Sequence, residues 1–167
     1  MHDDDISQPS QPWPFGPPSE DRGRRLMTAT LRGLKVLIVE DEYLIASLIE
    51  QMLEAAGCVI SGSIPRVAEA IEAARETECD VALLDVNLVG KQVYQVAEQL
   101  AERGIPFLFL SGYAQDVLPS GFAERPWLRK PFKRSELYQA LSNLIEQRAP
   151  VDLKSSLYAP PARPASI

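Results

Sequence analysis

The chain has 167 residues, 46% of which are apolar, and its formal net charge is −6 at pH 7. This length suits one folded domain with terminal extensions, and the negative charge disfavours nucleic acid as a partner because phosphate contacts need basic side chains. No apolar run approaches the roughly 18 residues of a membrane span, and the N-terminal sequence lacks the apolar core of a signal peptide. With only two cysteines, a disulfide framework is not expected, and a reducing, cytoplasmic location is predicted.

Both ends of the chain are rich in proline among polar residues. Such a composition cannot offset the entropy cost of ordering the backbone, so residues 1–33 are predicted to form a disordered arm and residues 149–167 a disordered tail. The single histidine, His2, lies in the arm, which argues against Ser-His-Asp hydrolysis and histidine-based zinc chemistry in the folded part. Residues 34–148 remain as the predicted domain.

Within this domain, apolar runs typical of buried strands alternate with the 3–4 spacing of amphipathic helices. The predicted strands are 35–39, 58–62, 80–84, 106–110 and 126–129. Regular helices are expected after strands one, two, three and five, over the apolar residues at 44–53, 67–74, 93–100 and 137–145. Gly57 and Gly104 are predicted to end the first and third helices. Segment 112–125 contains Pro119 and Gly121, so any helix there should be short and irregular.

Five strand–helix units in a row imply a parallel sheet with helices on both faces. The third strand supports this, because Val81–Leu84 is an uninterrupted apolar run that suits a strand covered on both faces. A domain of about 115 residues is short for a two-half dinucleotide-binding fold and suits a flavodoxin-like (βα)5 sandwich with strand order 2-1-3-4-5.

Polar side chains follow four of the predicted strands, at the edge where sheets of this type bind ligands. They are Glu40 and Asp41 after strand one, Asp85 and Asn87 after strand three, Ser111 after strand four and Lys130 after strand five. Strands one and three are neighbours in the predicted order, so Asp41 and Asp85 should face each other across about 5 Å. Carboxylates this close repel unless a cation lies between them, and a hard divalent cation such as Mg²⁺ fits best. With the Lys130 ammonium and the Ser111 hydroxyl, the set could hold a phosphoryl group on Asp85.

This set resembles the receiver domain of two-component response regulators over about residues 34–147. The resemblance is carried by Glu40-Asp41 after Val-Leu-Ile-Val, Asp85 in Leu-Leu-Asp-Val-Asn, the hydroxyl of Ser111, and Lys130 in Lys-Pro-Phe. Each motif is common by chance, but all four occur in the correct order and each ends a strand. Residues 106–113 are also similar to a subgroup of mostly alphaproteobacterial single-domain receivers with a Phe-Ala-Thr-Gly-Tyr-like sequence, although Leu110-Ser111 departs from that pattern.

The resemblance implies a phosphorylation-switched signalling module rather than an enzyme. Asp85 would accept a phosphoryl group from a histidine kinase or a histidine phosphotransfer protein, in a transfer and later hydrolysis that the receiver itself catalyses. Mg²⁺ would be held by Asp41, Asp85 and the Asn87 carbonyl, with Glu40 acting through water.

Ser111 would serve as the switch hydroxyl, and Trp127 matches the position of the switch aromatic. Because the tail is short and proline-rich, the expected output is contact with an unknown downstream protein or onward phosphoryl relay, without a DNA-binding domain.

Simpler interpretations of these residues stay open. Glu40, Asp41 and Glu42 could be cap and first-turn acids of the next helix. Asp85 and Ser111 could be turn residues, Lys130 a solvated surface lysine, and Trp127 a partly buried core aromatic.

Other functions are also open. A Mg²⁺-dependent phosphatase of the haloacid dehalogenase type also places an aspartate nucleophile after a strand, but it needs a second acid where this chain has Asn87. A flavin-binding electron carrier would need a Ser/Thr/Gly-rich phosphate loop in place of the acids at 40–42. A degenerate receiver that acts only as a scaffold would not need the complete set of acids, hydroxyl and lysine.

Overall fold

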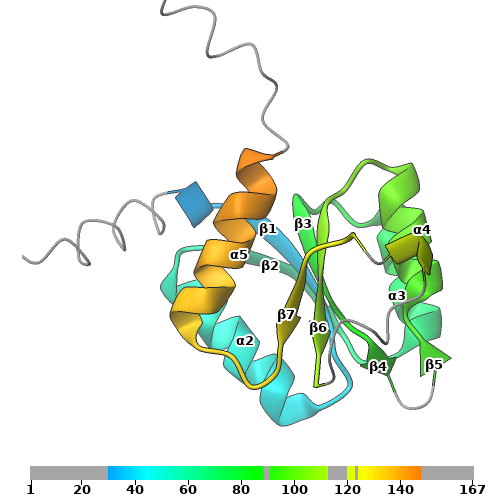
Figure 1. Cartoon of the computed structure of the whole chain (residues 1–167), viewed down its shortest axis with the longest axis horizontal. Helices are drawn as coiled ribbons and strands as arrows, with labels where there is room; N and C mark the ends of the chain where they lie inside the picture. Colours follow the sequence, from blue (N-terminus) through cyan, green and yellow to red (C-terminus); the bar gives the residue numbers. More distant parts are fainter. Residues whose placement is uncertain (1–29, 89–90, 113–119, 123, 148–167) are drawn as a thin grey trace, which may run out of the picture.

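The computed structural model describes residues 30–88, 91–112, 120–122 and 124–147. A parallel sheet of five strands forms its centre, in the order β2-β1-β3-β6-β7. The strands are Lys35–Val39 (β1), Val59–Ile64 (β2), Val81–Asp85 (β3), Phe107–Ser111 (β6) and Trp127–Arg129 (β7). Counted along the chain, these strands have the predicted order 2-1-3-4-5. The flavodoxin-like prediction is therefore confirmed, and the carboxyl ends of the strands meet at one edge (Figure 1).

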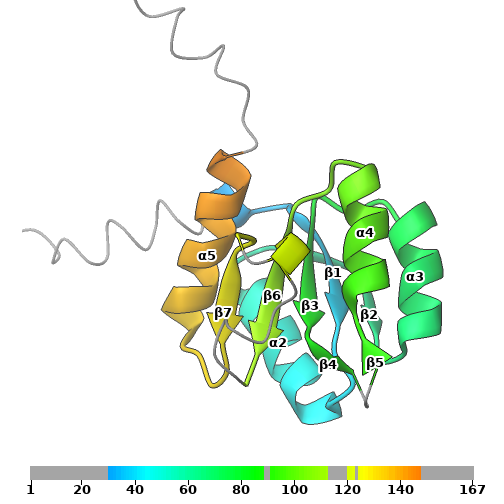
Figure 2. The ribbon, with the colours of Figure 1, turned by 45° about the vertical axis from the view of Figure 1, so that its right-hand side comes forward.

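In the described part of the chain, four α-helices cover the sheet, two on each face (Figures 1 and 2). Helices α2 and α5 share one face, and α3 and α4 share the other; they span Tyr43–Ala55 (α2), Val67–Glu76 (α3), Tyr94–Glu102 (α4) and Arg134–Glu146 (α5). Strand β6 shows why two cores form: Leu108 and Leu110 face α2 and α5, whereas Phe107 and Phe109 face α3 and α4. None of the four combines the length and apolar character that a membrane crossing requires.

Two predicted helix ends are confirmed. Gly57 follows α2 with φ of 81°, and Gly104 follows α4 with φ of 67°. Both lie in the left-handed region, which glycine adopts without a steric penalty from Cβ. These turns let the chain reverse directly into β2 and β6.

The buried face of α2 is narrower than its apolar pattern indicated. Ile49 and Leu53 are buried against the sheet, but 81% of Leu44 and 51% of Leu48 is exposed. Periodicity identifies the helix correctly, yet it cannot tell whether an apolar residue at the edge of the stripe faces the core or a surface cleft.

Two parts of the fold between β3 and β7 differ from the expected βα pattern. Asn87–Leu88 (β4) and Lys91–Gln92 (β5) form an unpredicted antiparallel pair directly after β3. Of the irregular segment 112–125, the structure describes a 3₁₀ turn at Ser120–Phe122 (η2), whereas 113–119 and 123 lie outside the described residues. The ring of Phe122 stacks on Tyr94 with centroids 5.4 Å apart.

The folded part begins earlier than the predicted boundary at residue 34. Leu31 is fully buried in the core shared by α2 and α5, and the Gly33 N–H donates to the Gly57 carbonyl at 2.7 Å. The arm prediction therefore needs correction at 30–33, because Leu31, which precedes the first predicted strand, completes the core. Residues 1–29 and 148–167, which make up the rest of the predicted arm and tail, lie outside the described residues.

Candidate functional site

Three carboxylates meet at the carboxyl edge of the sheet. Glu40 and Asp41 follow β1 and Asp85 ends β3, and these strands pair with Val39 opposite Leu84. One oxygen from each of the three carboxylates lies within 4.8 Å of the other two. The pairing of two central strands therefore places the acids together, as the sequence predicts for Asp41 and Asp85.

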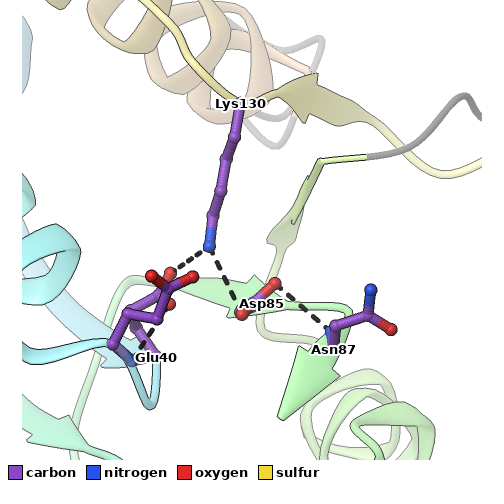
Figure 3. Close-up of polar contacts among 5 residues, drawn as sticks. Glu40, Asp85, Asn87 and Lys130 are labelled. Carbon is purple, nitrogen blue, oxygen red and sulfur yellow. Dashed lines mark hydrogen bonds and ion pairs between the residues drawn. The ribbon is translucent and has the colours of Figure 1, made fainter. Parts of the chain in front are cut away.

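Lys130 reaches these carboxylates from the end of β7. Its Nζ lies 2.5 Å from Glu40 Oε2 and 3.3 Å from Asp85 Oδ2 (Figure 3). The backbone N–H of Lys130 donates to the Ser111 carbonyl at 2.7 Å, which fixes the end of β7 against β6, and the Lys130–Pro131 peptide bond is cis. The ammonium thus bridges carboxylates from two strands, which a solvated surface lysine would not do.

The site is buried and carries excess negative charge. Exposed fractions are 2% for Glu40, 4% for Asp85 and 5% for Ser111. Burial raises the pKa of Glu40 from 4.5 to about 7; the charge of Asp85 acts in the same direction, and the hydrogen bond with Lys130 opposes it. When all three acids are ionised, three negative charges face one ammonium. This set of carboxylate oxygens has the donor chemistry that a hard divalent cation such as Mg²⁺ prefers.

Local contacts distinguish the site from an ordinary helix start. Glu42 is the N-cap of α2, but its side chain makes no capping hydrogen bond, and the first turn of α2 contains no acid. Glu40 Oε1 instead accepts the Glu42 N–H at 3.3 Å. The interpretation of Glu42 as a side-chain cap of α2 is therefore not supported.

Asp85 and Asn87 form the local turn that follows β3. Asp85 Oδ1 accepts the Asn87 N–H at 3.3 Å, as a turn aspartate does, while Oδ2 faces Lys130 (Figure 3). The turn contact and the ion pair coexist, and together they fix the orientation of the carboxylate. The Asn87 side chain itself is exposed.

The two predicted switch residues, Ser111 and Trp127, lie at different distances from the carboxylate cluster. Ser111 ends β6, the neighbour of β3, and is buried close to the level of Asp85, which pairs with Leu110. Trp127 is outside the carboxylate cluster. It begins β7 opposite Phe109 and is half-buried against the core under α3 and α4.

A cleft of about 660 Å³ opens beside the carboxylates. Its polar lining includes Asp85, Asn87 and Lys130, and its apolar lining is Ile45, Leu48, Ile49, Pro131 and Phe132. Sequence reasoning missed this apolar wall because it assigned the α2 residues to the core. The sequence could have indicated part of this wall, because Pro131 and Phe132 directly follow Lys130 and line the cleft beside it.

A family model of the response regulator receiver domain matches residues 36–142, which is more than half of the chain. The chain belongs to the receiver domain family. This membership makes it a two-component signalling protein and disfavours the phosphatase and flavin-carrier interpretations.

Individual relatives agree with the family. The cell cycle response regulator CtrA of Brucella ovis is 29% identical over 119 residues, covering 68% of this chain and 51% of CtrA. This receiver domain thus spans about half the length of the curated relatives it matches. SdrG from Sphingomonas melonis Fr1 is 41% identical with a TM-score of 0.61, covering 68% of this chain and 97% of SdrG.

A third relative bears on the metal. The receiver domain of the sensor histidine kinase PA1611 from Pseudomonas aeruginosa PAO1 is 26% identical with a TM-score of 0.56, covering 68% of this chain and 98% of that domain. Its crystal structure has a magnesium ion coordinated in the active site cleft. The acidic cluster of this chain has the donor chemistry for the same kind of ion.

Proposed function

We propose that this receiver domain is a phosphorylation-switched signalling module in which Asp85 accepts a phosphoryl group from a histidine kinase or a histidine phosphotransfer protein. The observation that carries the proposal is the convergence of Lys130 and two further carboxylates on the buried Asp85. An aspartate with only a local turn role would not need a partner from the far edge of the sheet.

The chemistry follows from the contacts of Asp85. One of its carboxylate oxygens attacks phosphorus, the P–N bond to the donor imidazole breaks, and the imidazole keeps the electron pair and is protonated. The Asn87 N–H orients the nucleophile, and Lys130 is close enough to neutralise charge on the phosphoryl oxygens. When bound at Asp41 and Asp85, Mg²⁺ would supply further charge neutralisation.

The surface around the cleft supports a protein as the donor. Tyr43, Leu44 and Leu48, in the first two turns of α2, are 81%, 81% and 51% exposed, and Leu48 lines the cleft. Grouped apolar side chains on a surface favour contact with another protein. The donor would cover these residues while its phosphohistidine enters the cleft toward Asp85.

Ser111 and Trp127 are the proposed output elements. The Ser111 hydroxyl would donate to a phosphoryl oxygen on Asp85, and the resulting movement at the end of β6 would reach Trp127 on the adjacent β7. The altered surface near β7 would then be recognised by a downstream protein or take part in onward relay.

Labelling by a small phosphodonor tests the proposal without a partner. The purified chain is incubated with phosphoramidate and Mg²⁺, and intact-mass spectrometry should show one added, acid-labile phosphoryl group. Asp85→Asn should abolish it, and chelation of Mg²⁺ should suppress it. Equal labelling of the Asn variant would reject Asp85 as acceptor, and no labelling of the wild-type chain would instead favour a degenerate, scaffolding receiver.

A further inference from the structure

The cleft beside the carboxylates has an apolar wall that the phosphoryl chemistry does not use. Ile45, Leu48 and Ile49 of α2 line one side of it, and Pro131 and Phe132 line the other. Its volume of about 660 Å³ is large enough for an aromatic side chain, since pockets of roughly 300–1,000 Å³ hold whole ligands. Leu48 is 51% exposed, so this wall is open to a further apolar group.

Basic residues border the Phe132 side of the cleft. Lys133 and Arg134 follow Phe132 directly, at the start of α5, and both are exposed. Their charges add to the positive end of the helix dipole. Glu136 offsets part of this charge, and its carboxylate accepts the Lys133 N–H at 2.6 Å. Asp85 also lines the cleft and would repel an acid placed beside it. The cleft therefore suits an occupant with an aromatic group for the apolar wall and acids for the start of α5.

The N-terminal segment, residues 1–21, has this composition and lies outside the described residues. Two aromatic residues, Trp13 and Phe15, stand among its prolines. It contains no lysine or arginine and five acids, which are Asp3, Asp4, Asp5, Glu20 and Asp21. Residues 148–167, by contrast, contain the single acid Asp152 and three basic residues. Charge complementarity to the start of α5 therefore favours the N-terminal segment as the occupant.

The N-terminal segment is attached close enough to reach the cleft. The described chain begins beside α5, and Leu31 packs in the core shared by α2 and α5, on the side of the sheet that carries the apolar wall (Figure 1). The Gly33 N–H donates to the Gly57 carbonyl, so the chain leaves the domain at the C-terminal end of α2, about 20 Å from the other end of this helix. Trp13 precedes Thr30 by 17 positions, and an extended chain of that length spans about 55 Å. Tethered segments reach effective concentrations in the millimolar range, so even a weak contact would be occupied.

We propose that the N-terminal segment docks in this cleft within the same chain, with Trp13 on the apolar wall and Asp3–Asp5 beside Lys133 and Arg134. The contact covers part of the surface proposed for a protein donor, because Leu48 belongs to both. Donor and segment then exclude each other, so the segment shields the acceptor from proteins that do not displace it. This consequence rests on the proposed function, whereas the docking itself does not.

The accessibility of Trp13 tests the docking in the full chain. Trp127→Phe leaves Trp13 as the single tryptophan, and acrylamide quenching of its fluorescence measures its exposure. Trp13 should be quenched several-fold less efficiently in the folded chain than in urea. Adding Leu48→Asp should raise its quenching toward the level in urea. Val59→Asp is the control, because Val59 is 50% exposed on β2, at the edge of the sheet away from α5, and it should leave the quenching unchanged.

Charge reversal provides a second set of variants in the same background. Lys133→Glu with Arg134→Glu should expose Trp13, although acids at the start of α5 favour the helix itself. Adding Asp3→Lys, Asp4→Lys and Asp5→Lys to that pair should restore the protection. Low salt is used throughout, because these exposed charges are screened at high ionic strength.

Two results would overturn the docking. One is equal quenching of Trp13 in the parent chain, in Leu48→Asp and in the charge-reversed chain. The other is protection that rises with protein concentration, since the segment would then lie on a second copy. Phosphoramidate labelling of the same samples keeps the claims apart. Labelled Asp85 with freely quenched Trp13 rejects only the docked segment, and protected Trp13 with unlabelled Asp85 rejects only the proposed function.

Discussion

Lys130 Nζ and Glu40 Oε2 meet at 2.5 Å although the two residues are 90 positions apart in the chain. Glu40 follows the second strand from one edge of the sheet, and Lys130 follows the opposite edge strand, with β3 and β6 between them. Three strand spacings amount to about 14 Å. The end of β7 and a fully extended lysine must therefore reach back over β6, and Asp85 lies along that path.

The pKa of Glu40 predicts a specific pH dependence of stability. Because folding raises this pKa from 4.5 to about 7, the protonated form is favoured in the folded state. Protonation of Glu40 therefore stabilises the folded state relative to the unfolded state. This contribution to the free energy of unfolding is complete below about pH 4.5 and is lost as the pH rises through about 7. Relative to Glu40→Gln, the wild-type free energy of unfolding should fall over this window by on the order of 3 kcal/mol. Urea unfolding from pH 4 to 8 with chelator measures this, and parallel curves for the two proteins would contradict it.

The exposed apolar residues of α2 should affect phosphoryl transfer from a protein donor, but not from a small-molecule donor such as phosphoramidate. Leu44→Ser and Leu48→Ser remove contact area beside the cleft without touching Asp85, so phosphotransfer from a cognate kinase should slow at least several-fold. Labelling by phosphoramidate should stay within about twofold of wild type. Val59 offers a matched control, because it is 50% exposed on β2, at the edge of the sheet away from Lys130. If Val59→Ser slows the kinase reaction as much, α2 is not the contact surface.

Much of the fold was predictable because it depends on short-range patterns and general topology rules. Apolar runs identified the five sheet strands, Gly57 and Gly104 identified two helix ends, and the 2-1-3-4-5 order then placed Asp41 beside Asp85. The side-chain contacts within the site were not predictable, because they depend on the three-dimensional path of the chain. The choice of Glu40 as the nearer partner of Lys130 follows from the path of the chain after β7, which no local pattern encodes.

The burial of individual apolar residues was also not predictable. Leu31 lies outside every predicted strand and helix yet is fully buried, and Leu44 belongs to an apolar stripe yet is 81% exposed. In both cases the neighbours that decide exposure come from distant parts of the chain.

Leu31 yields a prediction about the domain boundary. A chain trimmed to 27–148 should melt within about 5 °C of the full chain, since a larger change would correspond to roughly 1 kcal/mol of lost packing. A chain trimmed to 34–148 also loses Leu31 and should melt distinctly lower. In the full chain, Leu31→Ala should cost about 2–5 kcal/mol, as for other buried leucines. Calorimetry on the two trimmed chains provides the test, and equal melting temperatures would show that Leu31 contributes little.

Trp127 should report phosphorylation through Ser111. The two residues lie on adjacent paired strands, and Trp127 packs half-buried in the same core as Phe109 and Phe122, so a shift at the end of β6 changes its surroundings. Phosphorylation adds up to about two negative charges and three acceptor oxygens, which the Ser111 hydroxyl can approach. With Trp13 replaced by Phe to remove its background, Trp127 fluorescence should change when phosphoramidate and Mg²⁺ are added.

The Ser111→Ala variant separates acceptance of the phosphoryl group from its output. It retains Asp85, Lys130 and the acidic cluster, so it should still gain one phosphoryl group in intact-mass measurements. It lacks the hydroxyl that would respond to that group, so it should lose most of the Trp127 fluorescence change and bind the downstream protein more weakly. Asp85→Asn serves as the control in which neither labelling nor a fluorescence change occurs. A full fluorescence change in Ser111→Ala would mean that the signal leaves Asp85 by a route that does not involve this hydroxyl.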